Sequence, residues 1–186
     1  LLSITSPISV EQLESLVDCQ VARAIPSITN RAFSGVSLIT YGHSCHKDTK
    51  RTLEELFEHI SNPVQIEDDI TRVSSDIVSC GPAFFSYLLQ KFVDGAVAET
   101  NITKDQAVLL ASEMIIGMGK LLETEIYTLP TLQDKVMVKG GVTGMGIKVL
   151  EEEVGDMFAK VFQVTHEKYY EDIEEVSVQF NKIPHK

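Results

Sequence analysis

A proline-containing segment near the middle of the chain has residue types suited to anion binding. Ser79 and Cys80 are followed by Gly81 and Pro82, and an apolar helical pattern continues from there. Proline is favoured at the first position of a helix, so the sequence predicts a helix that begins at Pro82. Such a start presents free N–H groups and the positive end of the helix dipole to a carboxylate or phosphate. A kink within a longer helix is the alternative interpretation.

A glycine-rich segment later in the chain is also suited to anion binding. It reads Lys139-Gly140-Gly141-Val142-Thr143-Gly144, and a helical pattern follows. The two adjacent glycines allow backbone angles in which amides converge on an anion, and Thr143 is expected to be the N-cap of the next helix. No strand precedes the segment, so the pattern of a dinucleotide-binding loop is not met. A simple turn between two helices is the alternative.

Other residues able to do chemistry are sparse. His43, Cys45 and His46 lie close together in sequence, but no second ligand pair stands at a spacing typical of zinc sites. We therefore expect a surface turn there and no metal. The three cysteines are odd in number, which favours free thiols in a reducing cytoplasm. Cys80, at the predicted helix start, is expected to have a lowered pKa.

The elements over residues 1–70 are short and alternate in type. Apolar runs predict strands at residues 1–5, 21–25, 35–41 and 64–66, and helices are predicted after Ser9, with Gln12 completing a capping box, and over residues 48–60. This alternation predicts an α/β domain with much parallel pairing. The chain begins without Met inside an apolar run, so we expect more protein before Leu1.

From about residue 71 the pattern is helical. Helices are predicted over residues 82–96, 104–122, 131–138, 143–152 and 156–175, with the last ten residues frayed. The helix over 104–122, which a Thr103–Gln106 capping box opens, is apolar over so much of its surface that burial on more than one side is expected. We predict an all-helical domain over residues 71–186 that forms an obligate homodimer. The alternative is that the apolar stripes pack only on one another.

Charge and hydropathy exclude several partners. The formal net charge is −11, and such a field repels phosphate backbones, so no nucleic acid is expected. No apolar run reaches the roughly 20 residues that span a bilayer, and no membrane partner is expected. The acidic residues that crowd the C-terminal part are interpreted as a solvated helix face.

Three segments together resemble one protein family. Residues 79–84 resemble the Gly-Ser-Gly-Pro-Ala-Tyr segment of the pyrroline-5-carboxylate reductases. Residues 140–143 and the later Val149-Leu150-Glu151 resemble the family's Pro-Gly-Gly-Thr-Thr and Val-Leu-Glu, and residues 22–26 resemble its Val-Arg-Ala-Met-Pro. Order and spacing agree over nearly the whole chain. Where this sequence differs from the reductases, it is most similar to the ComER subgroup, the late-competence operon proteins of this family.

The resemblance implies a fold, a reaction and partners. Residues 1–70 would be the C-terminal half of a Rossmann-type NAD(P)-binding domain, and residues 71–186 a helical domain that interlocks with a partner's in a homodimer or higher oligomer. The reaction would be reduction of a cyclic imine, pyrroline-5-carboxylate, to proline, with NADPH or NADH as hydride donor. The Gly-rich pyrophosphate loop would lie before Leu1, so residues 1–186 are not expected to bind a dinucleotide tightly.

The resemblance also implies roles for named residues. Thr143 would be the catalytic donor to the imine nitrogen. The substrate carboxylate would be held by amides of Gly140, Gly141, Val142 and Thr143, which suits a helix N-terminus. The same substrate pocket would be lined by Ser79, Cys80, Gly81 and Pro82. The segment under the nicotinamide would be Arg23, Ala24, Ile25 and Pro26.

Four departures from the family pattern leave two functions open. Ser27 replaces Asn, Arg72 replaces Asp, Phe84 replaces Tyr, and Val138-Lys139 replaces Ser-Pro. A hydroxyl lost at Val138 removes a donor worth about 1.5–3 kcal/mol to a charged acceptor, and Lys139 would restore charge with different geometry. The first function is an NAD(P)H-dependent reductase of a cyclic imine. The second is a ComER-type, competence-associated dimeric protein of the same fold with altered or lost catalysis.

Overall fold

The computed structural model describes residues 1–180, which form two compact units. The first, here called the sheet unit, contains residues 1–84 and the chain from Ala159 onward. The second, the helical unit, contains residues 85–158. The domain boundary expected near residue 70 stays a prediction.

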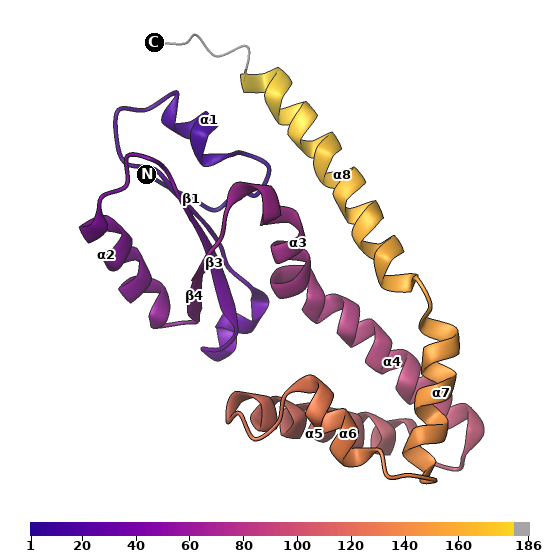
Figure 1. The fold of residues 1–186 in the computed structure, drawn as a ribbon. Coiled ribbons are helices and arrows are strands. Elements are labelled where there is room, and N and C mark those ends of the chain that lie inside the picture. The colour runs from indigo at the N-terminus through magenta and orange to yellow at the C-terminus, as the bar shows by residue number, and fades with distance from the viewer. Residues whose placement is uncertain (181–186) are drawn as a thin grey trace. The chain divides into compact units, whose positions relative to one another are not determined.

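A four-stranded mixed sheet lies at the centre of the sheet unit (Figure 1). Its strands follow one another in chain order: β1 (Leu2–Ser3), β2 (Ala22–Ile25), β3 (Val36–Tyr41) and β4 (Asn62–Gln65). The outer pairs β1–β2 and β3–β4 are parallel, and they are connected through α1 (Val10–Glu14) and α2 (Lys47–Glu58). The α/β class is thus confirmed, and the predicted strands are found, although β1 has only two residues.

The expectation of parallel pairing is wrong for the central pair, because β2 and β3 are antiparallel. The chain between them, residues 26–35, is shorter than the dozen or so residues that a parallel crossover requires. It contains the 3-10 helix η1 (Ile28–Ala32) and closes at Gly35, where φ is +76°. A Cβ at Gly35 would lie 2.2 Å from Thr29 Oγ1, so only glycine fits this turn.

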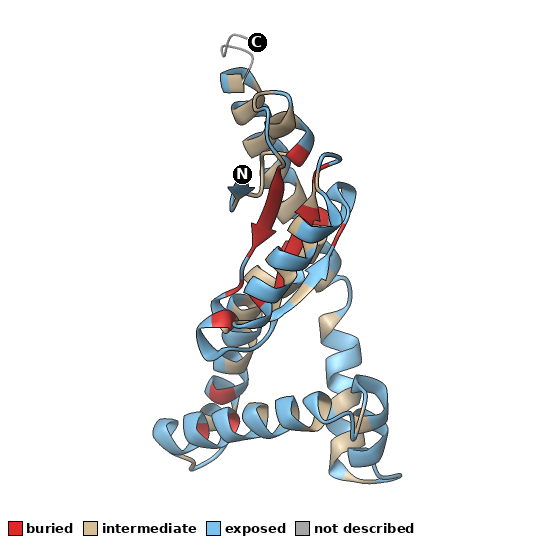
Figure 2. Ribbon diagram, turned by 90° about the vertical axis from the view of Figure 1, so that its left-hand side faces the viewer, coloured by how far each residue is buried: buried red, intermediate tan, exposed pale blue. Residues whose placement is uncertain are grey.

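Each face of the sheet carries an apolar cluster, because successive residues of β2 and β3 point to opposite faces. Ala24 lies opposite Ile39 and packs with Phe57 of α2 on one face. Ile25 lies opposite Leu38 and packs with Ile66 on the other face. Figure 2 shows that the buried residues concentrate in these strands.

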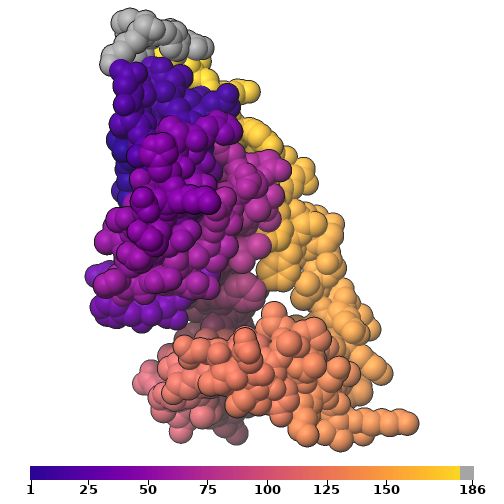
Figure 3. Space-filling view, turned by 60° about the vertical axis from the view of Figure 1, so that its left-hand side comes forward, coloured from indigo at the N-terminus to yellow at the C-terminus, as the bar shows by residue number. Residues whose placement is uncertain are grey.

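A continuous helical path leaves the sheet after the 3-10 helix η2 (Asp68–Ile70). It consists of α3 (Thr71–Ser75), the π-helical turn η3 (Asp76–Cys80) and α4 (Gly81–Glu99). The long helix α8 (Met157–Phe180) returns to the sheet unit from Ala159 onward and lies along it in Figure 3. Fraying was expected from residue 177, yet α8 is helical to Phe180, and the remaining six residues lie outside the described part.

The helical unit has a small core. It contains the later part of α4, then α5 (Lys104–Glu123), α6 (Leu129–Val136) and α7 (Val142–Val154). The predicted capping boxes at Ser9 and Thr103 are confirmed. Only Val93, Ala107 and Ala111 form a buried cluster, so within one chain α5 is not buried on several sides as expected. Large exposed apolar side chains include Phe85, Phe92, Leu109, Leu110, Met114 and Ile116.

Arg23 on β2 is only 1% exposed, and its guanidinium is held by several hydrogen bonds. It donates to the carbonyls of Ser6 (3.1 Å) and Ile8 (3.2 Å), and to the Thr40 hydroxyl (3.3 Å). It also donates to Asp68 Oδ1 (2.5 Å) and Thr71 Oγ1 (2.6 Å). Buried charge is tolerated when it is paired and hydrogen-bonded, as here.

Arg23→Ala is predicted to destabilise the protein by about 3–5 kcal/mol, because it leaves several buried acceptors and Asp68 without their donor. Urea unfolding measures the change. The matched control is Arg51→Ala, since Arg51 pairs with Asp48 and Glu55 on the exposed face of α2, where a change within about 0.5 kcal/mol is expected. Equal unfolding midpoints for the two variants would contradict this role for Arg23.

Candidate functional site

The predicted helix start at Pro82 does not exist, because Pro82 lies inside the continuous path from α3 to α4. The alternative interpretation, a local distortion in a longer helix, is the observed one. Proline has no N–H for the carbonyl four residues before it, and the wider π-turn at Asp76–Cys80 lies just where that carbonyl must be accommodated. No free helix N-terminus is therefore available to an anion at residues 79–82.

The expected lowering of the Cys80 pKa is wrong, because Cys80 does not stand at a free helix N-terminus. Burial raises the pKa of the Cys80 thiol, and the nearby Asp76 carboxylate adds to this, while the Arg72 guanidinium opposes it. Arg72 Nη2 lies 3.4 Å from Cys80 Sγ. A thiol with a raised pKa carries less thiolate at neutral pH, which does not suit it to nucleophilic catalysis.

Two serine hydroxyls join the segment after β2 to the π-helical turn η3. The Ser27 hydroxyl donates to the Val78 carbonyl (2.6 Å), which is the carbonyl that Pro82 leaves without its usual helical donor. In the opposite direction, the Ser79 hydroxyl donates to the Pro26 carbonyl (3.2 Å). The structure therefore brings residues 26–27 and 78–79 together within the sheet unit.

The residues assigned to the cofactor are mostly inside the fold. Arg23, Ala24 and Ile25 are buried, and only Pro26 of this segment is exposed. The Arg23 side chain is committed to the internal hydrogen bonds described above. A role for the segment under a nicotinamide stays a prediction, and it rests on Pro26 at the end of β2.

The glycine-rich segment forms a turn before α7. The Gly141 amide donates to the Val138 carbonyl (2.9 Å), and Gly140, at the third position of this turn, has a φ of +75°, as a type II turn requires. The N-cap of α7 is Gly141 and not Thr143, so the expected capping role of Thr143 is wrong. The turn shifts the helix start toward the N-terminus and places Thr143 inside the first turn.

The amides available to an anion follow from this geometry. Because Gly141 N–H is used in the turn, the donors without helical partners are those of the first turn, from Val142 onward. A hollow of about 290 Å³ beside the turn is lined by residues 137–141, Gly144, Met145, Ile147, Lys148 and Glu151. Thr143 does not line it. These residues belong to the helical unit, whereas Ser79–Pro82 belong to the sheet unit, and their assignment to one substrate stays a prediction.

A buried carboxylate that the sequence did not single out lies one turn before Cys80. Asp76 is 1% exposed, and Arg72 Nη2 donates to its Oδ1 (2.8 Å). Thr165 of α8 donates to its Oδ2 (2.7 Å), and His166 Nδ1 lies 4.0 Å from the same oxygen. The signal available in the sequence was an acidic residue within a run that is otherwise apolar or small, from Val73 to Cys80.

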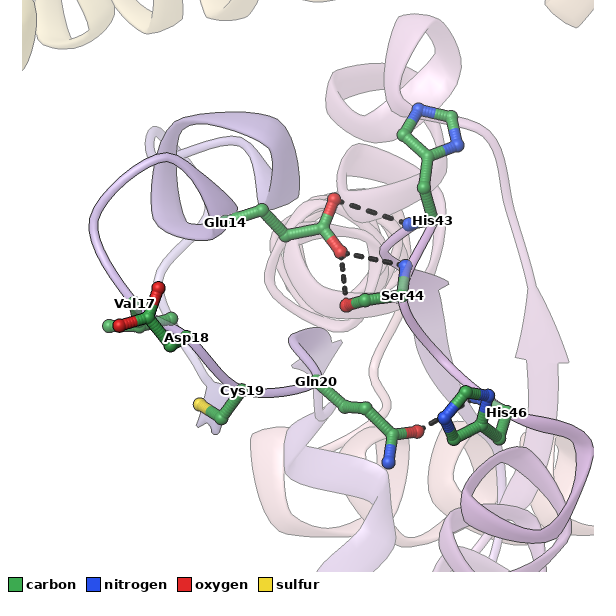
Figure 4. Close-up of a pocket in the computed structure, with 8 residues that line it drawn as sticks. All are labelled: Glu14, Val17, Asp18, Cys19, Gln20, His43, Ser44 and His46. Carbon is green, nitrogen blue, oxygen red and sulfur yellow. Dashed lines mark hydrogen bonds between the residues drawn. The ribbon is translucent and has the colours of Figure 1, made fainter.

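The histidine-containing turn holds a carboxylate as a hydrogen-bond acceptor (Figure 4). The Glu14 carboxylate accepts from the amides of His43 (3.2 Å) and Ser44 (3.0 Å) and from Ser44 Oγ (2.5 Å), and these bonds lower the pKa of Glu14. The Cys45 thiol donates to the Val21 carbonyl (3.0 Å). Across residues 1–180, no three His, Cys, Asp or Glu side chains gather where they could hold a metal ion.

None of the helices within residues 1–180 is long and apolar enough to cross a bilayer.

Comparison with known proteins gives related sequences. ComE operon protein 4 of Bacillus subtilis (strain 168) is 65% identical over 97% of this chain and 66% of its own length. Pyrroline-5-carboxylate reductase 3 of the same strain is 28% identical over 96% of this chain and 66% of its own length. The chain thus spans 66% of the length of each of these relatives.

Solved structures agree on the fold. A 1-pyrroline-5-carboxylate reductase from Streptococcus pyogenes aligns with a TM-score of 0.80 at 16% identity, over 90% of this chain and 66% of that one. The Plasmodium falciparum pyrroline carboxylate reductase with NADP bound aligns with a TM-score of 0.76 at 18% identity, over 94% and 70%. At such low identity these similarities concern the fold alone.

The family model described as pyrroline-5-carboxylate reductase dimerisation matches residues 67–172, more than half of the chain. This match and the resemblance of the three sequence segments agree with each other, and the chain belongs to the pyrroline-5-carboxylate reductase family.

Proposed function

We propose that the protein has the role of ComE operon protein 4, as a competence-associated homodimer that keeps the reductase fold while its imine-reducing chemistry is altered or lost. The observation that carries the proposal is the contrast in identity, 65% to that protein against 28% to a reductase of the same bacterium. Both comparisons cover almost the whole chain, so the contrast does not come from one conserved segment.

The geometry at the glycine-rich turn supports an altered reaction. Val138 is 69% exposed at the point where the reductases carry serine, and its apolar side chain lines the hollow beside the turn. A substrate carboxylate near the first turn of α7 would find amide donors but no hydroxyl at this position. Lys139 lines the same hollow and supplies a positive charge in place of a directed hydroxyl donor.

The second departure from the family pattern, Arg72, makes its contacts inside the protein. Arg72, which replaces an aspartate of the family pattern, is directed to Asp76 and Cys80. An arginine held in this way is not free to take over the role of the residue that it replaces. The change of charge at residue 72 therefore supports an altered environment beside Ser79–Pro82.

A retained reduction of a cyclic imine is the competing function, and the first turn of α7 favours it. Its amides suit a carboxylate, and the half-buried Thr143 could donate to the substrate nitrogen, which gains a proton as the imine becomes an amine. A bound nicotinamide dinucleotide would supply the hydride. Of the four residues expected under the nicotinamide, only Pro26 is exposed. This chain would therefore provide one wall of the nicotinamide site and would not bind the dinucleotide tightly.

Homodimer formation through the helical unit is part of the proposal. A dimerisation family model covers this unit, and its helices expose Leu109, Leu110 and other large apolar side chains. Many large exposed apolar side chains on one set of helices are typical of an interface.

We predict that the wild-type chain sediments as a dimer at micromolar concentration and that Leu110→Glu sediments as a monomer, because the new charge would be buried at the interface. The control is Leu56→Glu, which changes a leucine of similar exposure (58% against 61%) on α2 of the sheet unit. Circular dichroism checks that both variants fold. A monomeric wild type, or loss of the dimer in both variants, would refute the assignment of the interface.

The altered chemistry is tested by restoring the missing hydroxyl. In the full-length protein, Val138→Ser is predicted to raise kcat/KM for pyrroline-5-carboxylate by about 10- to 100-fold, as expected for one hydrogen bond to a charged group. The control is Val136→Ser, an exposed valine at the end of α6 outside the turn, for which no change is expected. Efficient wild-type turnover that Val138→Ser leaves unchanged would favour the competing function.

A further inference from the structure

The attachment of α8 to the sheet unit differs from that of the other elements. From Ala159 to Phe180 the helix has no buried residue, and none of its side chains belongs to the buried clusters of the sheet. Half-buried residues recur along one face, among them Val161, Phe162, Thr165 and Tyr169. The helix therefore lies on the sheet unit without contributing to the cooperative apolar core.

Its specific contacts are polar and gather around one buried carboxylate. Thr165 Oγ1 donates to Asp76 Oδ2 (2.7 Å), and the Asp76 side chain is fully buried. One turn further along, the Tyr169 hydroxyl donates to the Ser6 carbonyl (2.9 Å). The Arg72 guanidinium lies over the Tyr169 ring, 5.5 Å from its centroid.

The carboxylate keeps a partner when α8 is absent. Arg72 and Asp76 stand four residues apart on the same helical path, so their ion pair does not depend on α8. If α8 moved away, water could replace the Thr165 hydroxyl on Asp76 and would also reach Arg72. Two arrangements thus satisfy the same carboxylate, one with α8 docked and one with it released.

We propose that residues 159–180 of α8 form a releasable strap, which is held to the sheet unit by Thr165 on Asp76 and by Tyr169 on Ser6 and Arg72. Release of the strap exposes the Arg72–Asp76 pair, one turn before Cys80, while the sheet stays folded. This inference depends only on contacts within the sheet unit, and it holds whether or not the protein reduces an imine.

Hydrogen–deuterium exchange of the full-length protein tests the strap. Thr165→Val keeps the β-branched shape and removes the hydroxyl, so amides of residues 159–180 are expected to exchange about 10-fold faster, while β2 and β3 exchange at wild-type rates. Thr165→Ser keeps the hydroxyl and is expected to restore wild-type exchange in α8. Tyr169→Phe removes the second contact and is expected to speed exchange in the same residues.

Two results would overturn the proposal. One is unchanged exchange of α8 in both Thr165→Val and Tyr169→Phe, which would mean that these contacts do not hold the helix. The other is faster exchange in α8, β2 and β3 by the same factor, which would mean that α8 unfolds only together with the sheet.

Discussion

The guanidinium of Arg23 bonds to oxygens from three separate stretches of chain: the loop after β1, strand β3, and the consecutive elements η2 and α3. A positively charged residue that is only 1% exposed is stable when its charge is paired and hydrogen-bonded, so these stretches must converge on it. Their convergence fixes residues 68–71 beside the sheet and thereby sets where α3 begins. Within the sheet unit, residues 22–26 and 79–84, two of the segments that carry the family resemblance, are positioned from this point.

The path that follows α3 is shaped by Pro82. A proline inside a helix removes a donor and crowds the carbonyl four residues earlier, and here a π-turn and the Ser27 hydroxyl accommodate that carbonyl. The same turn buries Asp76 against Arg72. Two positions that depart from the family pattern, Ser27 and Arg72, thus hydrogen-bond within this chain.

Much of the fold could be predicted from local patterns. The capping boxes at Ser9 and Thr103 depend on spacings of three residues, and the strands depend on short apolar runs, so both are visible in the sequence. The antiparallel pairing of β2 with β3 was missed, because it depends on a short connection closed by Gly35 and not on the composition of the strands.

The candidate site was less predictable for physical reasons. Pro82 matches the signature of a helix start, but its place inside a longer helix depends on contacts with Ser27, which is distant in sequence. Thr143 matches an N-cap, but the turn formed by Val138 and Gly141 starts the helix earlier. The burial of Asp76 depends on Thr165, 89 residues away along the chain. At Pro82 and Asp76 a tertiary contact outweighs the local preference, whereas at Thr143 a neighbouring turn does.

The central claim is that this chain keeps the reductase fold while the reduction of pyrroline-5-carboxylate is altered or lost. The most direct measurement is NADPH oxidation by the full-length wild-type protein with pyrroline-5-carboxylate, with pyrroline-5-carboxylate reductase 3 of Bacillus subtilis as the positive control. We expect the kcat/KM of this protein to be at least about 10-fold below that of the control, which corresponds to one lost hydrogen bond to a charged group. A kcat/KM equal to that of the control would contradict the claim.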